Sequence, residues 1–414
     1  MSGTADLHDM ARNTPGGGIK DYEGQIDMVA LRAWRLGRVQ AELKRRDLAG
    51  IVLSDFINIR YATGARNWGV WSARLGGRYA WIPAEGKATL FEVGRVWAAD
   101  GLESIGEVRQ ATNWIFWMAG PDQQSKADAW AAELADLISA GGANRRVAFD
   151  RLDPMGLAAV HKAGLEYLPG EELMARARLI KGPQEIQCMN ISLAVCDIGI
   201  ARMKAALKPG ITENALWSHL HQANIEHGGE WIEARLLASG GRTNPWGMEC
   251  GDRMIRPGDL VAFDTDMIGP FGYCADVSRT FFCGPGKPSD EQKTMYRLAH
   301  EQIYTNLELM RAGLTFREVS ERSWRAPNQY AANAMFVLHG VGLEDEYPSI
   351  PTWNNVDRLP EPEARLESGM TLCLEAYIGA EHGAEGIKLE EQILITDSGP
   401  QILSLYPFED ELMS

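Results

Sequence analysis

Carboxylates that interrupt apolar, strand-like segments constrain the fold of this chain more than any other feature. The segment VAFDTDMIGPFGYCADVSRTFF, which begins at Val261, is typical of two apolar strands joined by a turn. It nevertheless contains Asp264, Asp266 and Asp276, although carboxylates are depleted in strands and are costly to bury without a partner. Asp264 and Asp266 are two positions apart, so on a regular strand they point to the same face, and Asp276 on the returning strand can face them. A fold that contains this segment must therefore supply counter-charge.

Two further acids and one histidine extend this pattern. Glu375 lies in LCLEAYIG, Glu390 in GIKLEEQILIT, and His339 in the glycine-flanked segment FVLHGVGLEDEYP. Two unit charges about 4 Å apart repel by about 4 kcal/mol at an effective dielectric constant of about 20, so acids gathered at one place need cations. Oxygen ligands with one imidazole suit Mn, Fe, Co or Zn in a dinuclear site. Each acid alone could instead be an exposed strand residue or a helix N-cap. Together they predict a dinuclear metal site formed by Asp264, Asp266, Asp276, His339, Glu375 and Glu390.

The length of the chain, 414 residues, predicts two domains. Residues 1–30 are glycine-rich and polar, and we expect them to form an N-terminal arm. Strand-like and helical segments alternate through residues 31–175, which is typical of an α/β domain. Residues 176–414 open with a long segment whose apolar residues recur every three or four positions, indicating a helix, and they end in strand-like segments. We therefore expect an α/β two-domain protein.

Composition excludes several classes of function. The net charge of −15, without a basic run, argues against binding to nucleic acid. We find neither an apolar run of membrane-span length nor the apolar core of a signal peptide, so we expect a cytoplasmic protein that does not bind membranes. The six cysteines are scattered and form no CxxC pair, which favours reduced thiols.

The order of these segments resembles the pita-bread metallopeptidase superfamily, which includes methionine aminopeptidase, aminopeptidase P, prolidase and creatinase. The matching segments are KGPQEI, LKPGITENAL, the Asp-bearing segment, HGVG and GIKLEEQILIT, spread over residues 178–400. SDFINIRYATG in the first half is similar to the creatinase/prolidase N-terminal domain. The resemblance implies an N-terminal creatinase-like α/β domain and a C-terminal pita-bread α+β catalytic domain. It also implies a metal set of Asp264, Asp276, His339, Glu375 and Glu390.

Three departures from the peptidase pattern change the implied activity. Peptidases of the superfamily carry a Pro-His pair upstream of the first metal aspartate, where this chain has Trp246 after a proline. They carry a second histidine seven residues after the metal histidine, where this chain has Glu346. Their D-x-G is D-x-D here, with Asp266 in place of glycine. D-x-D together with HGVGLEDEYP resembles the dimethylsulfoniopropionate (DMSP) lyase branch, whose metal set includes the extra aspartate.

This branch implies cleavage of DMSP, a small zwitterion, to dimethyl sulfide and acrylate by β-elimination. Iron is the implied metal, with Mn, Co or Zn as alternatives, and a homodimer is the implied assembly. The base of the branch maps onto Asp345, for which a solvated acidic loop is the competing interpretation. The tyrosine of the branch has no equivalent before His339, and Tyr330 is the nearest candidate. Aromatic faces attract sulfonium cations, which makes Trp246 and Tyr347 further candidate substrate-binding residues.

Three other functions remain open from the sequence. The first is an Xaa-Pro dipeptidase or aminopeptidase, which the missing histidines at positions 246 and 346 disfavour. The second is a non-catalytic binding module on the same fold, which the complete set of predicted ligands disfavours. The third is a C–N hydrolase of the creatinase type.

Overall fold

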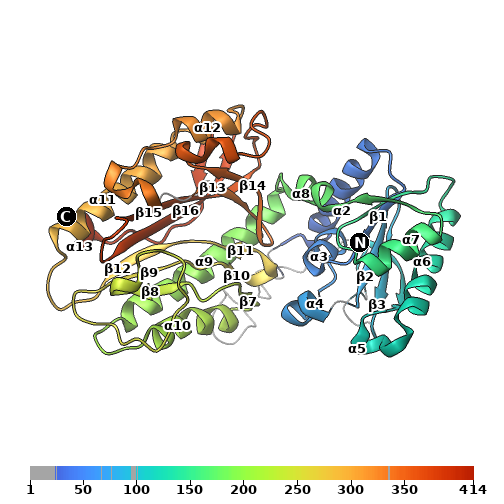
Figure 1. The fold of residues 1–414 in the computed structure, drawn as a ribbon, viewed down its shortest axis with the longest axis horizontal. Coiled ribbons are helices and arrows are strands. Elements are labelled where there is room, and N and C mark those ends of the chain that lie inside the picture. The colour runs from blue at the N-terminus through green and yellow to red at the C-terminus, as the bar shows by residue number, and fades with distance from the viewer. Residues whose placement is uncertain are drawn as a thin grey trace. The chain divides into compact units, whose positions relative to one another are not determined.

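The structure is a computed structural model that describes residues 24, 26–66, 68–75, 77–94, 99, 101–333 and 336–414. It contains two compact units, Asp27–Arg178 and a second that holds Leu179–Ser414, which Figure 1 shows in blue to green and in green to red. The division falls three residues beyond the predicted boundary at residue 175. Most of the predicted N-terminal arm, residues 1–30, lies outside the described residues.

The first unit is built on a six-stranded mixed sheet with the order β4-β3-β2-β1-β5-β6. β1 pairs in parallel with β5, and β5 with β6, whereas β2 runs antiparallel to both β1 and β3. α2 packs with α3 and α8, while α6 packs with α7, and the core lies around Trp81, Trp130 and Phe149. The strands are β1 (Gly50–Leu53), β2 (Tyr79–Pro83), β3 (Ala88–Glu92), β4 (Ile105–Gln110), β5 (Arg146–Phe149) and β6 (Glu166–Pro169). The helices are α2 (Met28–Arg45), α3 (Phe56–Thr63), α4 (Gly69–Leu75), α5 (Phe116–Ala119), α6 (Gln123–Ala140), α7 (Pro154–Lys162) and α8 (Glu171–Arg178).

The helices of the second unit begin where the sequence provides capping residues. α9 starts at Pro183, and the Glu185 carboxylate accepts a hydrogen bond from Gly182 N at 2.9 Å. Thr212 and Thr315 cap α10 and α12 with their hydroxyl groups. The helices are α9 (Pro183–Ala206), α10 (Glu213–Glu226), α11 (Asp290–Leu307), α12 (Phe316–Arg322) and α13 (Asp410–Met413).

The described residues of the second unit also form antiparallel sheets, in the orders β14-β13-β15-β16-β17, β12-β9-β8 and β11-β10-β7. α11 packs on β15 and β16, α9 packs on α10, and β16 also contacts β9 and β12 (Figure 1). The strands are β7 (Trp231–Ile232), β8 (Leu237–Ser239), β9 (Leu260–Phe263), β10 (Met267–Ile268), β11 (Cys274–Ala275), β12 (Arg279–Phe282), β13 (Phe336–Val341), β14 (Asp345–Pro351), β15 (Thr371–Gly379), β16 (Gly386–Thr396) and β17 (Gly399–Ile402). This arrangement confirms the expected two-domain α/β architecture.

α9 is long and apolar enough to cross a membrane by length and composition alone. Half of that stretch is buried within the fold, and Leu193, Cys196, Ile200 and Met203 belong to a core cluster. The core helix of a folded domain meets the same criterion, so this helix is weak evidence for a membrane span. All six cysteines are buried free thiols, as the sequence predicted.

Candidate metal centre

The three aspartates of the opening segment lie in strand breaks rather than on continuous strands. β9 ends before Asp264 and β10 begins after Asp266, while Asp276 follows the end of β11. Asp266 has a φ of 35°, a left-handed conformation that a regular strand does not contain. The alternation argument for these residues is therefore wrong in detail. The breaks still gather the acids, because Asp264, Asp266 and Asp276 each offer an oxygen atom within 4.8 Å of the others.

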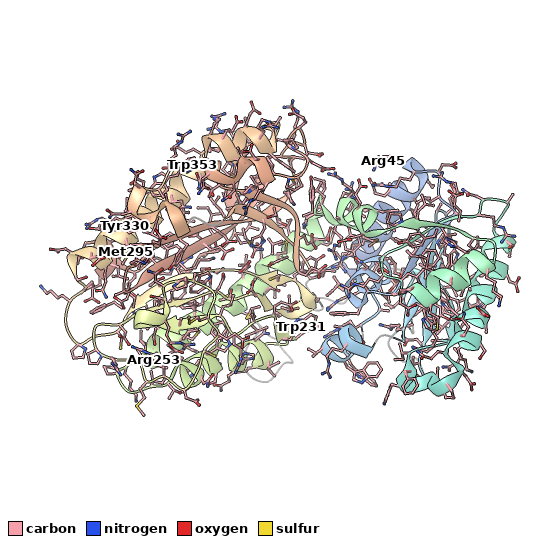
Figure 2. All side chains as sticks on the ribbon, in the orientation of Figure 1. Arg45, Trp231, Arg253, Met295, Tyr330 and Trp353 are labelled. Carbon is pink, nitrogen blue, oxygen red and sulfur yellow. The ribbon has the colours of Figure 1, made fainter. Side chains whose placement is uncertain are left out.

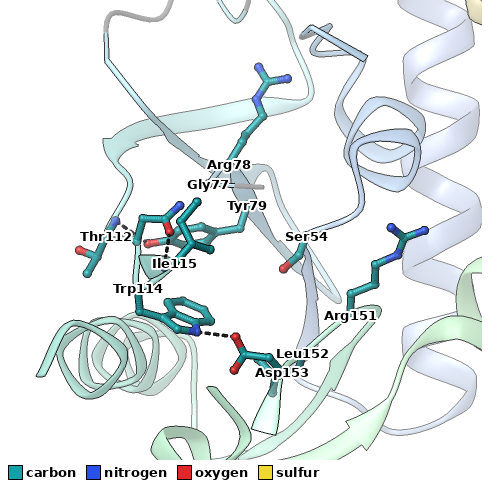
Figure 3. Close-up of a pocket in the computed structure, with 11 residues that line it drawn as sticks. Ser54, Gly77, Arg78, Tyr79, Thr112, Trp114, Ile115, Arg151, Leu152 and Asp153 are labelled. Atoms are coloured by element: carbon teal, nitrogen blue, oxygen red, sulfur yellow. Dashed lines mark hydrogen bonds between the residues drawn. The ribbon is translucent and has the colours of Figure 1, made fainter. Parts of the chain in front are cut away.

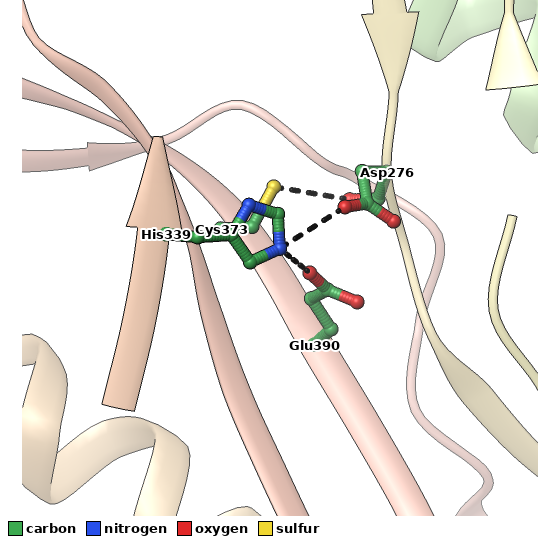
Figure 4. Close-up of side chains that lie close together, drawn as sticks. All are labelled: Asp276, His339, Cys373 and Glu390. Carbon is green, nitrogen blue, oxygen red and sulfur yellow. Dashed lines mark hydrogen bonds and ion pairs between the residues drawn. The ribbon is translucent and has the colours of Figure 1, made fainter. Parts of the chain in front are cut away.

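The five-stranded sheet supplies the remaining predicted ligands from β13, β15 and β16. Glu375 and Glu390 are directly opposite each other on β15 and β16. His339 Nε2 lies 3.2 Å from Glu375 Oε1, 3.5 Å from Asp276 Oδ2 and 3.7 Å from Glu390 Oε1. In Figure 4 the side chains of His339, Asp276 and Glu390 point toward one another. The structure thus brings the six predicted ligands into one cluster, and metal binding by them remains a prediction.

Lys388, which the sequence analysis missed, lies inside this cluster. Its Nζ is 3.0 Å from Asp264 Oδ2, from Glu375 Oε2 and from Glu390 Oε2, and it donates a 2.8 Å hydrogen bond to Ser278 Oγ. The Lys388 side chain is 0% exposed. A signal was available in the sequence, because Lys388 precedes Glu390 by two positions on a strand and must point to the same face.

Cys373 also reaches the cluster. It pairs with His339 across β13 and β15, and its Sγ lies with ligand atoms of Asp276, His339 and Glu390 in a group within 4.8 Å of one another (Figure 4). The thiol donates a long hydrogen bond of 4.0 Å to the Asp276 carbonyl oxygen. Cys373 therefore lies on the same strand as Glu375 and places a sulfur atom beside the histidine.

The protein atoms alone do not keep all the acids of this cluster ionised at neutral pH. Burial and the charge of Asp264 raise the pKa of Asp266 to about 9. Burial and the same charge raise the pKa of Glu390 to about 7, and burial with the charge of Glu390 raises the pKa of Asp276. Burial also opposes ionisation of Asp264, but the ammonium group of Lys388 and the hydrogen bonds with Glu390 and Ser278 together outweigh it and lower the pKa of that carboxyl. The cluster consequently holds fewer positive charges than its carboxylates require.

Two buried oxygen atoms test whether the cluster fits a metal. Asp276 Oδ1 and Glu390 Oε1 have no hydrogen-bond partner within the described part of the chain. Buried polar atoms are nearly always paired, so unpaired atoms require an explanation. Carboxylate oxygens beside an imidazole nitrogen are the donors that divalent Mn, Fe, Co and Zn bind. The residues therefore fit a metal centre.

Asp345, the predicted base, lies beside the cluster on its solvent side. It opens β14, its side chain is 60% exposed, and its Oδ1 is 3.8 Å from His339 Nδ1. Desolvation by the surrounding protein and the like charges of Asp264 and Glu375 raise the pKa of Asp345 above its ordinary value of 3.8. This carboxylate is close to the predicted ligands without being one of them.

Trp246 lies next to Lys388. The Lys388 Nζ is 5.9 Å from the centroid of the Trp246 ring, and the Tyr377 ring is 6.4 Å from it. The structure thus places the tryptophan beside the cluster, as predicted, with a cation already directed at its ring.

The two predicted tyrosines are used for packing. Tyr330 is 4% exposed and shares an apolar core cluster with Met295, and both are labelled in Figure 2. The Tyr347 hydroxyl donates a hydrogen bond to Glu361, and its ring lies 5.9 Å from that of Phe316. Substrate binding by Tyr330 or Tyr347 remains a prediction that these contacts do not favour.

Glu346, at the position where the resemblance places the second peptidase histidine, is buried. Its Oε2 lies 2.8 Å from Lys181 Nζ, and the two side chains are 3% and 2% exposed. Its Oε1 accepts a hydrogen bond from Leu343 N at 3.1 Å. This carboxylate is therefore committed to a buried ion pair.

A cavity of about 370 Å³ in the first unit offers less chemistry than the cluster. It lies at the carboxyl ends of β1 and β5, where Figure 3 shows Trp114 directed at Asp153. Trp114 Nε1 donates to Asp153 Oδ2 at 2.7 Å, and Asp153 Oδ1 caps α7 by accepting from Gly156 N. Tyr79 Oη accepts from Thr112 N at 3.2 Å. These polar groups hold the loops of the unit, so we take the cluster as the candidate site.

Comparisons with known proteins agree with this choice. Residues 187–397 match the model of metallopeptidase family M24, and residues 35–180 match the creatinase/prolidase N-terminal domain. The chain is 38% identical over 396 residues to the dimethylsulfoniopropionate lyase DddP of Roseovarius nubinhibens, spanning 94% of this chain and 88% of that protein. It is 35% identical over 405 residues to DddP of Roseobacter denitrificans, with the same coverage of 94% and 88%.

Solved structures of peptidases share the fold. An Xaa-Pro dipeptidase from Bacillus anthracis superposes with a TM-score of 0.74 at 23% identity and covers 91% of this chain and 99% of its own. A prolidase from Pyrococcus horikoshii OT3 superposes with a TM-score of 0.72 at 21% identity, with coverage of 91% and 99%. At these identities the similarity shows the fold alone.

Proposed function

Because the chain belongs to metallopeptidase family M24 and carries a creatinase/prolidase N-terminal domain, we propose a function within that fold. It is a metal-dependent lyase that cleaves DMSP to dimethyl sulfide and acrylate by β-elimination. The observation that carries this proposal is the similarity over 94% of the chain to two DMSP lyases. The cluster supports it, because the six predicted metal ligands lie together and Asp345 lies beside them.

The six predicted ligands would hold two divalent cations, for which we propose iron. When bound, the cations supply Lewis acidity that stabilises the negative charge developing on the substrate carboxylate. Asp264, Asp266 and Asp276 would bind from the strand breaks, and Glu375 and Glu390 from the five-stranded sheet together with His339.

Asp345 is the group that we assign to proton removal. Its carboxylate takes the proton from the α carbon, and the electron pair of that C–H bond forms the double bond between the α and β carbons. The bond between the β carbon and sulfur breaks, and its electron pair leaves with the sulfur as neutral dimethyl sulfide. No general acid is needed, because the leaving group departs uncharged. Asp345 then returns the proton to solvent, which its 60% exposure permits.

The raised pKa of Asp345 suits this role. A base removes a weakly acidic proton more effectively when its own pKa lies closer to the working pH. Desolvation by the surrounding protein is the largest cause that raises the Asp345 pKa above 3.8, and it does not depend on the charges of the neighbouring acids, so the residue is a stronger base than an isolated aspartate.

Trp246 is the residue that we assign to the sulfonium end of the substrate. A cation over an aromatic face is stabilised by about 0.5–2 kcal/mol. Lys388 Nζ already lies 5.9 Å from the centroid of this ring, so the sulfonium would use the other face.

A peptidase is the alternative, and two observations disfavour it. Trp246 stands where the peptidase histidine is expected, and Glu346 is held in a buried ion pair with Lys181 at 2.8 Å. A C–N hydrolase of the same fold is a further alternative, on which these observations do not bear.

A paired assay tests the proposal. Purified protein with quantified metal is incubated with DMSP and, separately, with an Xaa-Pro dipeptide. We expect dimethyl sulfide and acrylate in equal amounts from the first and no free proline from the second. Proline release without dimethyl sulfide would establish the peptidase instead.

The proposal also includes a homodimer and a cytoplasmic location. Sedimentation analysis of the purified protein tests the first, and fractionation of the cells that produce it tests the second.

A further inference from the structure

Lys388 stands in an unusual place for a lysine. Its ammonium group is within 3.0 Å of oxygen atoms from Asp264, Glu375 and Glu390, and its side chain is 0% exposed. Lys388 N donates to Thr280 Oγ1 at 3.1 Å, and the Lys388 carbonyl accepts from the same hydroxyl at 2.9 Å. Both the backbone and the charged end of this residue are therefore fixed.

Ser278 extends the contact from Lys388 to the acids. Its Oγ accepts from Lys388 Nζ at 2.8 Å and lies 2.6 Å from Asp264 Oδ1 and 2.7 Å from Glu390 Oε2. Asp264 comes from the break after β9 and Glu390 from β16. One ammonium group and one hydroxyl group thus join an acid from the break after β9 to acids on the five-stranded sheet.

The charges of the cluster balance only when this lysine is included. Asp264, Asp266, Asp276, Glu375 and Glu390 carry five formal negative charges when ionised. Two divalent cations supply four positive charges, and the Lys388 ammonium supplies the fifth. The extra carboxylate at Asp266, which distinguishes D-x-D from D-x-G, is thereby offset without a third metal ion.

We propose that Lys388 is a permanent third cation of the metal centre, a positioning residue that holds Asp264, Glu375 and Glu390 together whether or not divalent ions are bound. The proposal rests on the metal centre of the proposed function and is independent of the substrate. It predicts that Lys388 contributes most to stability when the divalent ions are removed, because the lysine and the His339 ring are then the groups of the described cluster that can offset its carboxylates.

Lys181 provides a matched comparison within the same unit. It is also a buried lysine, with a side chain 2% exposed and its Nζ 2.8 Å from Glu346 Oε2. Glu346 is not a predicted metal ligand. Replacing Lys181 should therefore lower stability equally with and without metal.

The experiment compares thermal unfolding with Mn²⁺ and with a chelator in the wild type, Lys388→Met, Lys388→Arg and Lys181→Met. The difference between the two midpoints is the metal-dependent stabilisation. Breaking a buried ion pair lowers the midpoint of a domain of this size by about 10 °C. For Lys388→Met we expect the unfolding midpoint to fall by that amount in chelator and by less than half that amount in Mn²⁺. The difference between its two midpoints should therefore be larger than in the wild type. For Lys388→Arg and Lys181→Met we expect the difference between the midpoints with Mn²⁺ and with chelator to equal that of the wild type.

Equal metal-dependent stabilisation in the wild type and in Lys388→Met would overturn the proposal, because the lysine would then act as Lys181 does. If Lys388→Met cannot be recovered in either condition, Lys388→Arg tests the proposal. The arginine variant must then bind two metal ions per chain and show the same metal-dependent stabilisation as the wild type. A wild type that gains no stability from metal would overturn the metal centre itself. If metal stabilises the wild type but the protein does not cleave DMSP, only the substrate of the proposed function would be overturned.

Discussion

Replacement of Asp345 by asparagine separates proton removal from metal binding. The Asp345 carboxylate lies 3.8 Å from His339 Nδ1 but is not among the six predicted ligands, and its side chain is 60% exposed. The change therefore removes one negative charge without leaving a cavity, and we expect the free energy of unfolding to change by less than about 0.5 kcal/mol. A positioned base contributes about 10²- to 10⁴-fold to a rate, which corresponds to about 3–5 kcal/mol of barrier. We expect kcat for DMSP cleavage to fall by that factor.

The assay measures acrylate release and metal content on the same preparation. Glu344→Gln is the matched control, because it removes the same charge from the adjoining position of the acidic loop. We expect the control to lose less than about tenfold in kcat, since it does not remove the proposed base. Normal turnover in Asp345→Asn, or equal losses in the two variants, would refute the assignment and favour a solvated acidic loop. Loss of metal from Asp345→Asn would show that the residue is a ligand.

Three further predictions follow from particular contacts. The carboxylate form of Asp345 is required and its pKa is raised, so a pH profile of kcat/KM should fall on the acid side at a pH above the ordinary aspartate value of 3.8; an acid limb at or below 3.8 would contradict this. Glu346→Gln leaves Lys181 charged and buried, and should lower the free energy of unfolding by about 3–5 kcal/mol in urea titrations. Asp128→Asn, which breaks the surface pair with Lys162, should change it much less. Trp246→Leu should raise KM for DMSP by about 2- to 30-fold and Trp246→Phe by less, and an unchanged KM in the leucine variant would remove the tryptophan from the substrate site.

Local features of the fold were predictable from the sequence. The apolar spacing of three and four residues indicated the helix that the structure contains at Pro183–Ala206, because one face of a helix repeats at that interval. Thr212 and Thr315 lie at the starts of α10 and α12, where a threonine hydroxyl satisfies an unpaired amide of the first turn. The strand breaks were not predictable from alternation. Asp266 adopts a φ of 35°. Whether a residue other than glycine can adopt that conformation depends on contacts with parts of the chain that are distant in sequence.

The predicted ligands could be selected because a carboxylate on an apolar strand is unfavourable by itself, so each one indicated a missing partner. Lys388 escaped the same reasoning, since a single lysine in a late strand is unremarkable until its three acidic partners are known. Those partners, at positions 264, 375 and 390, come from separate segments. The Lys181–Glu346 pair joins residues 165 positions apart in the sequence, and no local pattern predicts it. The sequence analysis therefore could not predict ion pairs between residues that are distant in sequence.

The charge balance of the proposed centre explains why Asp345 can serve as a base. Two divalent cations and Lys388 offset the five carboxylates of the cluster, so the centre has no excess positive charge that would hold a sixth acid in its ionised form. Asp345 lies outside that balance, 60% exposed and 3.8 Å from His339, and its carboxylate keeps its affinity for a proton. A peptidase of this fold would also need groups that contact a peptide and its tetrahedral intermediate, and those positions hold Trp246 and the buried Glu346. Elimination requires only that a proton leave the α carbon and a neutral sulfide leave the β carbon, and the groups that this site retains are sufficient for both.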